Sequence, residues 1–195
     1  MPAAPGGGDL FISSGTWSLV GFENSSPLLG AEALAARVAN ERTGDGAYRP
    51  LTNVIGLWLL EGVMKDFASR PVSGEDWDEL IAAAEALPAP MGLIDVADAA
   101  FTSPVSMKKA IDAHLVARGL PVPKDLAGYT RLICASLGRG HADAMLRFEG
   151  MAGRKFSRIL IVGGGSKNRL LCQATADAAG VPVVSFALEG TAVGN

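Results

Sequence analysis

The chain has few of the side chains from which metal centres and disulfides are built. Its 195 residues include 2 cysteines, Cys134 and Cys172, and 2 histidines, His114 and His141, which lie far apart in the sequence. Each cysteine falls in an apolar, helix-like pattern without a second cysteine at metal-ligand spacing. We therefore expect buried thiols, no metal ligands, and a reducing, cytoplasmic location.

Clustered positive charge and long hydrophobic runs are scarce too. The formal net charge of −3 argues against a nucleic-acid groove, which needs clustered Lys and Arg. The longest apolar runs, such as residues 54–60, are too short to span a bilayer, and no signal-peptide pattern opens the chain. Hydrophobic residues make up 49% and charged residues 19%, which is typical of a globular domain without a nucleic-acid or membrane partner.

The first half of the chain predicts two strands followed by helices. Residues 1–9 are rich in Pro and Gly and indicate a linker, so the domain is expected to begin at residue 10. Residues 10–23 predict two short strands on either side of the turn Ser13-Ser14-Gly15-Thr16, called here the hydroxyl turn. Three helices are expected next, an Ala-rich one within 31–40, a buried one over 53–68, and one that begins at the N-cap Ser73.

The second half predicts more helix and then a βαβ unit. Ser103 and Pro104 predict the start of a helix, and residues 125–150 predict a long one. An apolar strand over 158–162 leads into Gly163-Gly164-Gly165, called here the glycine turn, and a helix with Ser166 as its N-cap. A second apolar strand follows Gly180. The fold class is therefore α/β, with one domain in which helices pack on a mixed sheet.

The two turns are the best candidates for a binding site. Glycines between a strand and a helix let a ligand approach the backbone, and the N–H groups of the following helix favour a phosphate. Hydroxyls in a turn between strands donate hydrogen bonds to phosphate oxygens. Each turn also has a simpler interpretation as a tight connection without a ligand, and the glycine turn is not a Walker A loop because it lacks the Gly-Lys-Ser/Thr ending.

Other polar and aromatic residues have simple structural interpretations. Asn53 is expected as the N-cap of the buried helix, and Glu61 inside that helix is expected to be paired or exposed. His141 is expected to pack against its neighbours rather than act as a base. Trp17, Trp58 and Trp77 are expected in the core.

The order of several segments resembles one family. SSGTWSLVGFE, LTNVIGLWLLE, FTSPVSM, ILIVGGGSKNRLLCQATADAAGVPV and EGTAVGN follow one another as in the C-terminal half of the FGGY carbohydrate kinases, and most closely as in their rhamnulokinase branch. This resemblance covers nearly the whole chain. It implies a ribonuclease H-like, actin-type ATPase fold, as one half of a two-domain kinase that uses ATP and Mg²⁺.

The resemblance also implies roles for individual residues. Thr16 matches a position that contacts the ATP phosphates, and Gly164, with Gly163 and Gly165 beside it, matches the turn that backs the nucleotide. Asn53 matches a position associated with the sugar. Glu61 stands where relatives have a Gln near ATP, and a carboxylate there would repel phosphates unless a cation intervenes.

Two expected parts are not in this sequence. The family's first phosphate-binding loop and its catalytic Asp belong to an N-terminal domain, so we expect a missing partner domain, no catalytic residue here and no turnover by this chain alone. The expected reaction of the complete enzyme is phosphorylation of L-rhamnulose by ATP. Alternatives are a kinase for fuculose, xylulose or glycerol, or a non-catalytic nucleotide-binding module. Self-association through exposed apolar surface is a further expectation.

Overall fold

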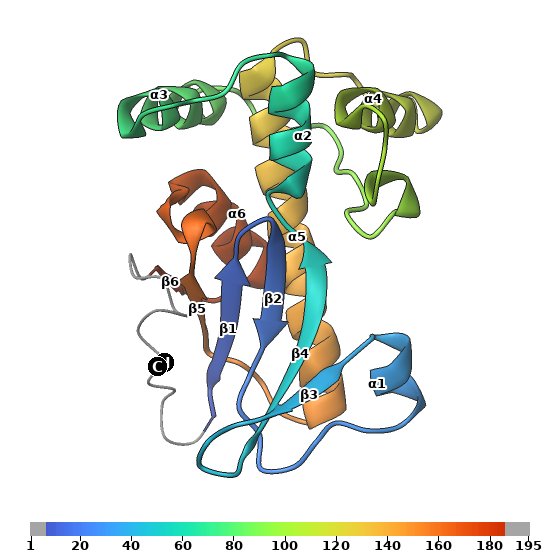
Figure 1. Ribbon diagram of the computed structural model, residues 1–195, viewed down its shortest axis with the longest axis vertical. Helices are drawn as coiled ribbons and strands as arrows, with labels where there is room; N and C mark the ends of the chain where they lie inside the picture. The colour runs from blue at the N-terminus through green and yellow to red at the C-terminus, as the bar shows by residue number, and fades with distance from the viewer. Residues whose placement is uncertain (1–6, 186–195) are drawn as a thin grey trace.

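A mixed sheet forms the centre of the molecule in the computed structural model, which describes residues 7–185. Within that range the strand order is β3-β4-β2-β1-β5-β6 (Figure 1). The strands are β1 (Asp9–Ser14), β2 (Trp17–Gly21), β3 (Ala39–Arg42), β4 (Tyr48–Ile55), β5 (Arg158–Val162) and β6 (Val183–Ser185). β1 pairs antiparallel with β2 and parallel with β5, so the first strand lies beside the strand that precedes the glycine turn.

Helices cover one face of this sheet and extend beyond one end of it. The long helix α5 (Leu126–Ala152) runs behind the strands, and α2, α3 and α4 gather beyond the end of the sheet that carries the hydroxyl turn (Figure 1). The other helices are α1 (Ala31–Ala35), α2 (Trp58–Asp66), α3 (Gly74–Glu85), α4 (Met107–Ala117) and α6 (Arg169–Ala179), with short 3-10 helices η1 (Ala99–Phe101) and η2 (Gly164–Lys167).

Alternation along the strands defines the two faces of the sheet. Leu10 and Ile12 on β1 and Val20 on β2 are fully buried in the core. Trp17 and Leu19, which alternate with the buried Ser18 and Val20 on β2, are 48% and 36% exposed. The expectation that Trp17 is a core residue was wrong, because the period of two places it on the open face of the sheet.

The helix expected over residues 53–68 is in fact a strand and a helix. β4 continues through Ile55, where it pairs with β2, and α2 begins only at Trp58. Thr52, Val54 and Ile55 are β-branched, and pairing with β2 decides in favour of the strand. Asn53 is therefore not an N-cap, and it lies directly opposite Leu19 in the register.

Several predicted helix ends are confirmed and others are displaced. Ser73 caps α3 in a capping box with Asp76, and Gly180 ends α6 in the left-handed conformation. By contrast, α4 is capped by Ser106 rather than Ser103, and α6 is capped by Asn168 rather than Ser166. Ser106 lies three residues after Ser103, and Asn168 lies two residues after Ser166. Each of these side chains accepts a hydrogen bond from a backbone N–H in the first turn of its helix.

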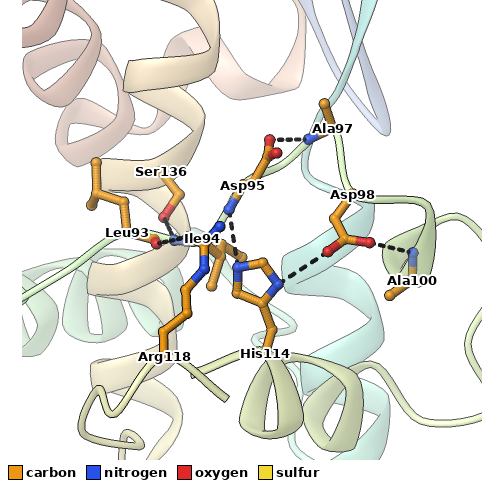
Figure 2. Close-up of polar contacts among 9 residues, drawn as sticks. All are labelled: Leu93, Ile94, Asp95, Ala97, Asp98, Ala100, His114, Arg118 and Ser136. Atoms are coloured by element: carbon orange, nitrogen blue, oxygen red, sulfur yellow. Dashed lines mark hydrogen bonds and ion pairs between the residues drawn. The ribbon is translucent and has the colours of Figure 1, made fainter. Parts of the chain in front are cut away.

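A polar cluster holds the segment between α3 and α4 onto the helices (Figure 2). His114 on α4 lies with Nδ1 3.2 Å from Asp98 Oδ2, and its Nε2 accepts the N–H of Asp95 at 3.4 Å. Ser136 on α5 accepts the N–H of Ile94 at 3.2 Å. With both ring nitrogens engaged, His114 serves as an anchor for this segment.

No helix in residues 7–185 is long and apolar enough to cross a membrane.

Candidate functional site

The hydroxyl turn and the glycine turn lie side by side at one end of the sheet. In the parallel pairing of β1 with β5, Ser13 is opposite Val162, so the two strands leave the sheet together. The turns that sequence reasoning singled out stand near opposite ends of the chain, and the fold makes them neighbours. We call the hydroxyl turn, the glycine turn and Gly56 together the cradle.

Two glycines of the glycine turn are required by contact with β1. Gly163 has φ 85°, and a Cβ there would come within 2.5 Å of the Ser14 carbonyl oxygen. A Cβ on Gly165 would overlap Ser14 Oγ. Gly164, between them, is exposed, and a Cβ there would have open space around it. The turn therefore presses against β1 on both sides and presents bare backbone to solvent at its centre.

Ser14 contributes a buried hydroxyl beneath the glycine turn. Its side chain is 1% exposed, and its Oγ has no hydrogen-bond partner among the described residues. A buried polar atom without a partner is uncommon, and such atoms often mark sites that a ligand or water completes. The cradle thus has an unused donor next to its glycines.

The backbone of the hydroxyl turn is fixed by the start of α2. Leu57 N–H donates to Gly15 O at 2.9 Å, and the N–H groups of Gly56 and Trp58 donate to Thr16 O at 3.2 and 3.1 Å. A Cβ on Gly56 would lie 2.6 Å from Gly15 O. The side chain of Thr16 remains exposed. Its hydroxyl is therefore presented to solvent from a rigid backbone.

Gly56 and Ser14 carry roles that sequence reasoning missed. A glycine between the apolar residues Ile55 and Leu57 was a visible signal, but it was absorbed into the expected helix. Ser14 was named only as one hydroxyl of the turn, and its missing partner is a property of the packed structure.

Asn53 and Glu61 lie on different elements from the two turns. Asn53 is exposed on β4, on the open face of the sheet that also carries Leu19 and Trp17. Glu61 is exposed on α2 and forms an ion pair with Arg70 at 2.8 Å. Glu61 is therefore both paired and exposed, and an exposed ion pair of this kind contributes little to stability.

A cavity of about 350 Å³ adjoins the glycine turn on the side of α6 and β6. Its lining includes Ser166, Lys167, Arg169 and Cys172. Thr16 does not line it, so the cavity extends the glycine turn but does not join the two turns.

His141 is fully buried in the layer below the cradle. Its Nδ1 lies 3.0 Å from Thr175 Oγ1 on α6, and its Nε2 lies 2.9 Å from Ser18 Oγ on β2. Burial lowers the pKa of His141 from its ordinary value to about 4, so the ring is neutral near pH 7. The expectation of a packed histidine is confirmed.

The cysteines and the acidic residues supply neither a nucleophile nor a metal cage. Cys134 and Cys172 are free thiols, and burial raises the pKa of Cys134 to about 12, which disfavours the reactive thiolate. Within the described residues 7–185, no group of three or more His, Cys, Asp or Glu side chains could hold a metal ion. The cradle fits an anionic ligand by its hydroxyls and bare backbone, but this part of the chain provides no Mg²⁺ cage.

Comparisons with known proteins agree with this arrangement. The C-terminal domain of the FGGY family of carbohydrate kinases matches residues 10–195. The chain is 42% identical over 185 residues to a rhamnulokinase of Enterobacter sp. (strain 638), and the match covers 95% of this chain and 37% of the relative. The chain thus spans little more than a third of the length of that relative.

Solved structures support the fold. A xylulose kinase from Bifidobacterium adolescentis superposes with a TM-score of 0.63 at 19% identity, covering 93% of this chain and 34% of the other. Plasmodium falciparum glycerol kinase with ADP gives a TM-score of 0.62 at 10% identity, covering 90% and 34%. The predicted ribonuclease H-like, actin-type fold is confirmed, and the chain belongs to the FGGY family of carbohydrate kinases as its C-terminal domain.

Proposed function

We propose that this chain supplies the nucleotide-binding half of an ATP-dependent sugar kinase of the rhamnulokinase type. The observation that carries the proposal is that the hydroxyl turn, which includes Thr16, and the glycine turn lie together at one end of the sheet, beside the unpaired hydroxyl of Ser14. Hydroxyl and N–H donors held on rigid backbone suit the phosphates of a nucleotide, whose charge they stabilise without reorganising.

Each part of the cradle has its own task in this proposal. Thr16 donates its hydroxyl to a phosphate oxygen, while the N–H groups of Gly56 and Trp58 hold its backbone carbonyl in place. Gly163 and Gly165 let the glycine turn close onto β1, and Gly164 lets the nucleotide pack against backbone. Arg70 neutralises Glu61, so that this carboxylate does not repel the phosphates. Mg²⁺ would arrive with the nucleotide and neutralise its phosphates.

The proposed reaction transfers the γ-phosphoryl group of ATP to the O1 hydroxyl of L-rhamnulose and leaves ADP. The 42% identity to a rhamnulokinase favours this sugar over xylulose or glycerol, whose kinases resemble the chain at 20% identity or less in fold alone. Asn53, exposed on the open sheet face beside Leu19, is the residue that we assign to the sugar. In a phosphoryl transfer of this kind, positioning and charge stabilisation do most of the catalytic work.

The general base and the first phosphate loop belong, in this proposal, to an N-terminal partner domain, with residues 1–9 as the linker and the domain beginning at residue 10. β1 itself begins at Asp9. The chain alone would bind MgATP weakly and would not turn over, and the assembled enzyme would act in the cytoplasm.

A titration of the ¹⁵N-labelled chain with MgATP tests this proposal. Amide shifts are expected to move at residues 15–17 and 163–166, with millimolar affinity, and Thr16→Val is expected to weaken binding several-fold because it removes the donor but keeps the shape. Asn53→Ala, on the sheet face assigned to the sugar, is the matched control and should leave MgATP affinity unchanged. Shifts confined to other surfaces, or equal binding by Thr16→Val, would exclude the cradle as the nucleotide site.

A coupled ADP-release assay with L-rhamnulose tests the assignment of the general base to an N-terminal partner domain. No sugar-dependent turnover by the isolated chain is expected, because the base is assigned to another domain. Clear turnover would refute that assignment.

A further inference from the structure

The ring of His141 connects the two elements that carry the cradle. Ser18, which binds Nε2, belongs to β2 and follows Thr16 by two residues. Thr175, which binds Nδ1, belongs to α6, the helix that follows the glycine turn. One side chain on α5 therefore links the strand behind one turn to the helix behind the other.

Burial makes this link restrict the position of α6 relative to β2. His141, Ser18 and Thr175 are each 0% exposed, so water cannot replace either hydrogen bond. A buried hydroxyl that loses its partner is strongly disfavoured, whereas apolar contacts tolerate small slides of one element over another. Only those positions of α6 relative to β2 that keep both hydrogen bonds are therefore favourable.

The packing of α5 against α6 supports the same interpretation. Gly138 lies one turn before His141, and a Cβ there would come within 2.5 Å of the Ala174 backbone and 2.8 Å of Thr175 N. The two helices thus meet through backbone at this crossing, which sets their separation. The hydrogen bonds of His141 then fix how far α6 is displaced along the crossing.

We propose that His141 is a positioning residue that holds the hydroxyl turn and the glycine turn in the geometry that binds nucleotide. His141 does not touch the ligand and acts through Ser18 and Thr175. The claim about nucleotide affinity rests on the proposed function, while the claim about the placement of the two turns does not.

Three variants separate positioning from simple core stability. His141→Phe fills the space and leaves Ser18 and Thr175 unpaired. The triple variant His141→Phe, Ser18→Ala, Thr175→Val removes every polar group of the link, so no buried hydroxyl is left unpaired and stability is expected to recover. Ser136→Ala is the matched control, because it removes from the same helix a buried hydroxyl that accepts the N–H of Ile94 instead of bonding to β2 or α6 (Figure 2).

Amide hydrogen exchange gives a readout that needs no nucleotide. Exchange at residues 15–18 and 163–168 is expected to become several-fold faster in His141→Phe and in the triple variant, and to stay at the wild-type rate in Ser136→Ala. If His141→Phe does not fold, His141→Gln, which keeps a donor and an acceptor, takes its place with a smaller expected change.

MgATP titration of the same variants completes the test. The triple variant is expected to regain stability but to bind MgATP several-fold more weakly than wild type, whereas Ser136→Ala binds normally. Recovery of both stability and wild-type exchange in the triple variant would overturn the positioning role. If wild type itself shows no shifts at the cradle, the proposed function fails, and the exchange rates alone then decide the role of His141.

Discussion

The three residues of the glycine turn differ in backbone conformation and in the contacts around them. Gly163 combines a positive φ with a close contact to Ser14 O, and Gly165 packs on the Ser14 side chain. Gly164 has an ordinary conformation and open space where a side chain would begin. Two of the glycines therefore serve the fold, and the central one is free to serve a ligand.

Alanine at these positions is expected to separate fold from binding. Gly163→Ala should lower the free energy of unfolding by about 1–3 kcal/mol, since its backbone conformation is nearly exclusive to glycine. Gly164→Ala should change it by no more than about 0.5 kcal/mol, yet weaken MgATP binding by placing a methyl group against the nucleotide. Chemical denaturation and titration measure the two effects. Unchanged MgATP affinity in Gly164→Ala would place the nucleotide elsewhere.

Sequence reasoning singled out those residues of the candidate site that carry a chemical signature. Thr16 and Gly164 stand in turns whose composition favours phosphate, and the structure brings those turns together. The unpaired hydroxyl of Ser14 and the close backbone approach at Gly56 were not predicted, because both exist only once distant segments pack. The roles of Thr16, Gly164, Asn53 and Glu61 remain predictions.

Helix α5 contains glycines that differ in their neighbours. At Gly138 a Cβ would press on the backbone of α6, at 2.5 Å from Ala174. At Gly150, on the same helix, the nearest atom to a Cβ is Glu32 Oε1 at 4.0 Å. The first glycine permits a helix crossing, and the second has no such contact.

A pair of glycine-to-alanine substitutions on α5 tests this difference. Gly138→Ala is expected to destabilise the protein by about 1–3 kcal/mol, because α6 must shift outward. Gly150→Ala is expected to stabilise it by up to about 1 kcal/mol, since alanine favours the helix interior. Thermal or chemical unfolding of both variants measures the difference. Equal effects would show that the crossing adapts to a methyl group.

At the level of elements, local patterns predicted the type of segment better than its ends. The βαβ unit with the glycine turn was predicted correctly because its strands and helix have strong, distinct periodicities. Residues 53–68 were misassigned because an apolar run reads equally as helix or strand, and only pairing with β2 settles the matter. The misplacement of Asn53 follows from that error, since an N-cap and an exposed strand position are different environments.

The whole molecule is arranged so that one end of the sheet is ready for a ligand while its support is buried. The cradle projects from the ends of β1, β2 and β5, and α5 passes behind them with His141 in contact with β2 and α6 (Figure 1). Stability and binding therefore share one buried polar link, and a condition that charges the ring should affect both.

Acidification is expected to destabilise the molecule through His141. Burial lowers the pKa of this ring to about 4 in the folded state, against an unfolded value of 6.5, so the unfolded chain binds the extra proton in the window between these values. The stability contributed by the neutral ring is thus complete above pH 6.5 and decreases as the pH falls toward 4. Between pH 7 and pH 5 the free energy of unfolding should fall by about 2 kcal/mol from this residue.

Two carboxylates that gain hydrogen-bond partners in the fold, Asp76 and Glu149, contribute to stability at lower pH than His141 does. Hydrogen bonds hold the pKa of Asp76 below its ordinary value of 3.8, and Lys155 and the N–H of Phe156 outweigh desolvation to lower that of Glu149 below 4.5. Their contributions are present above the ordinary values of 3.8 and 4.5 and are lost as the pH falls below these toward the lowered values. Urea unfolding of wild type and His141→Gln at pH 7, 6 and 5 therefore isolates the ring. The variant is expected to lose most of the pH slope over this range, and a slope equal to that of wild type would mean that His141 binds the same number of protons in the folded and unfolded states, so that folding does not lower its pKa.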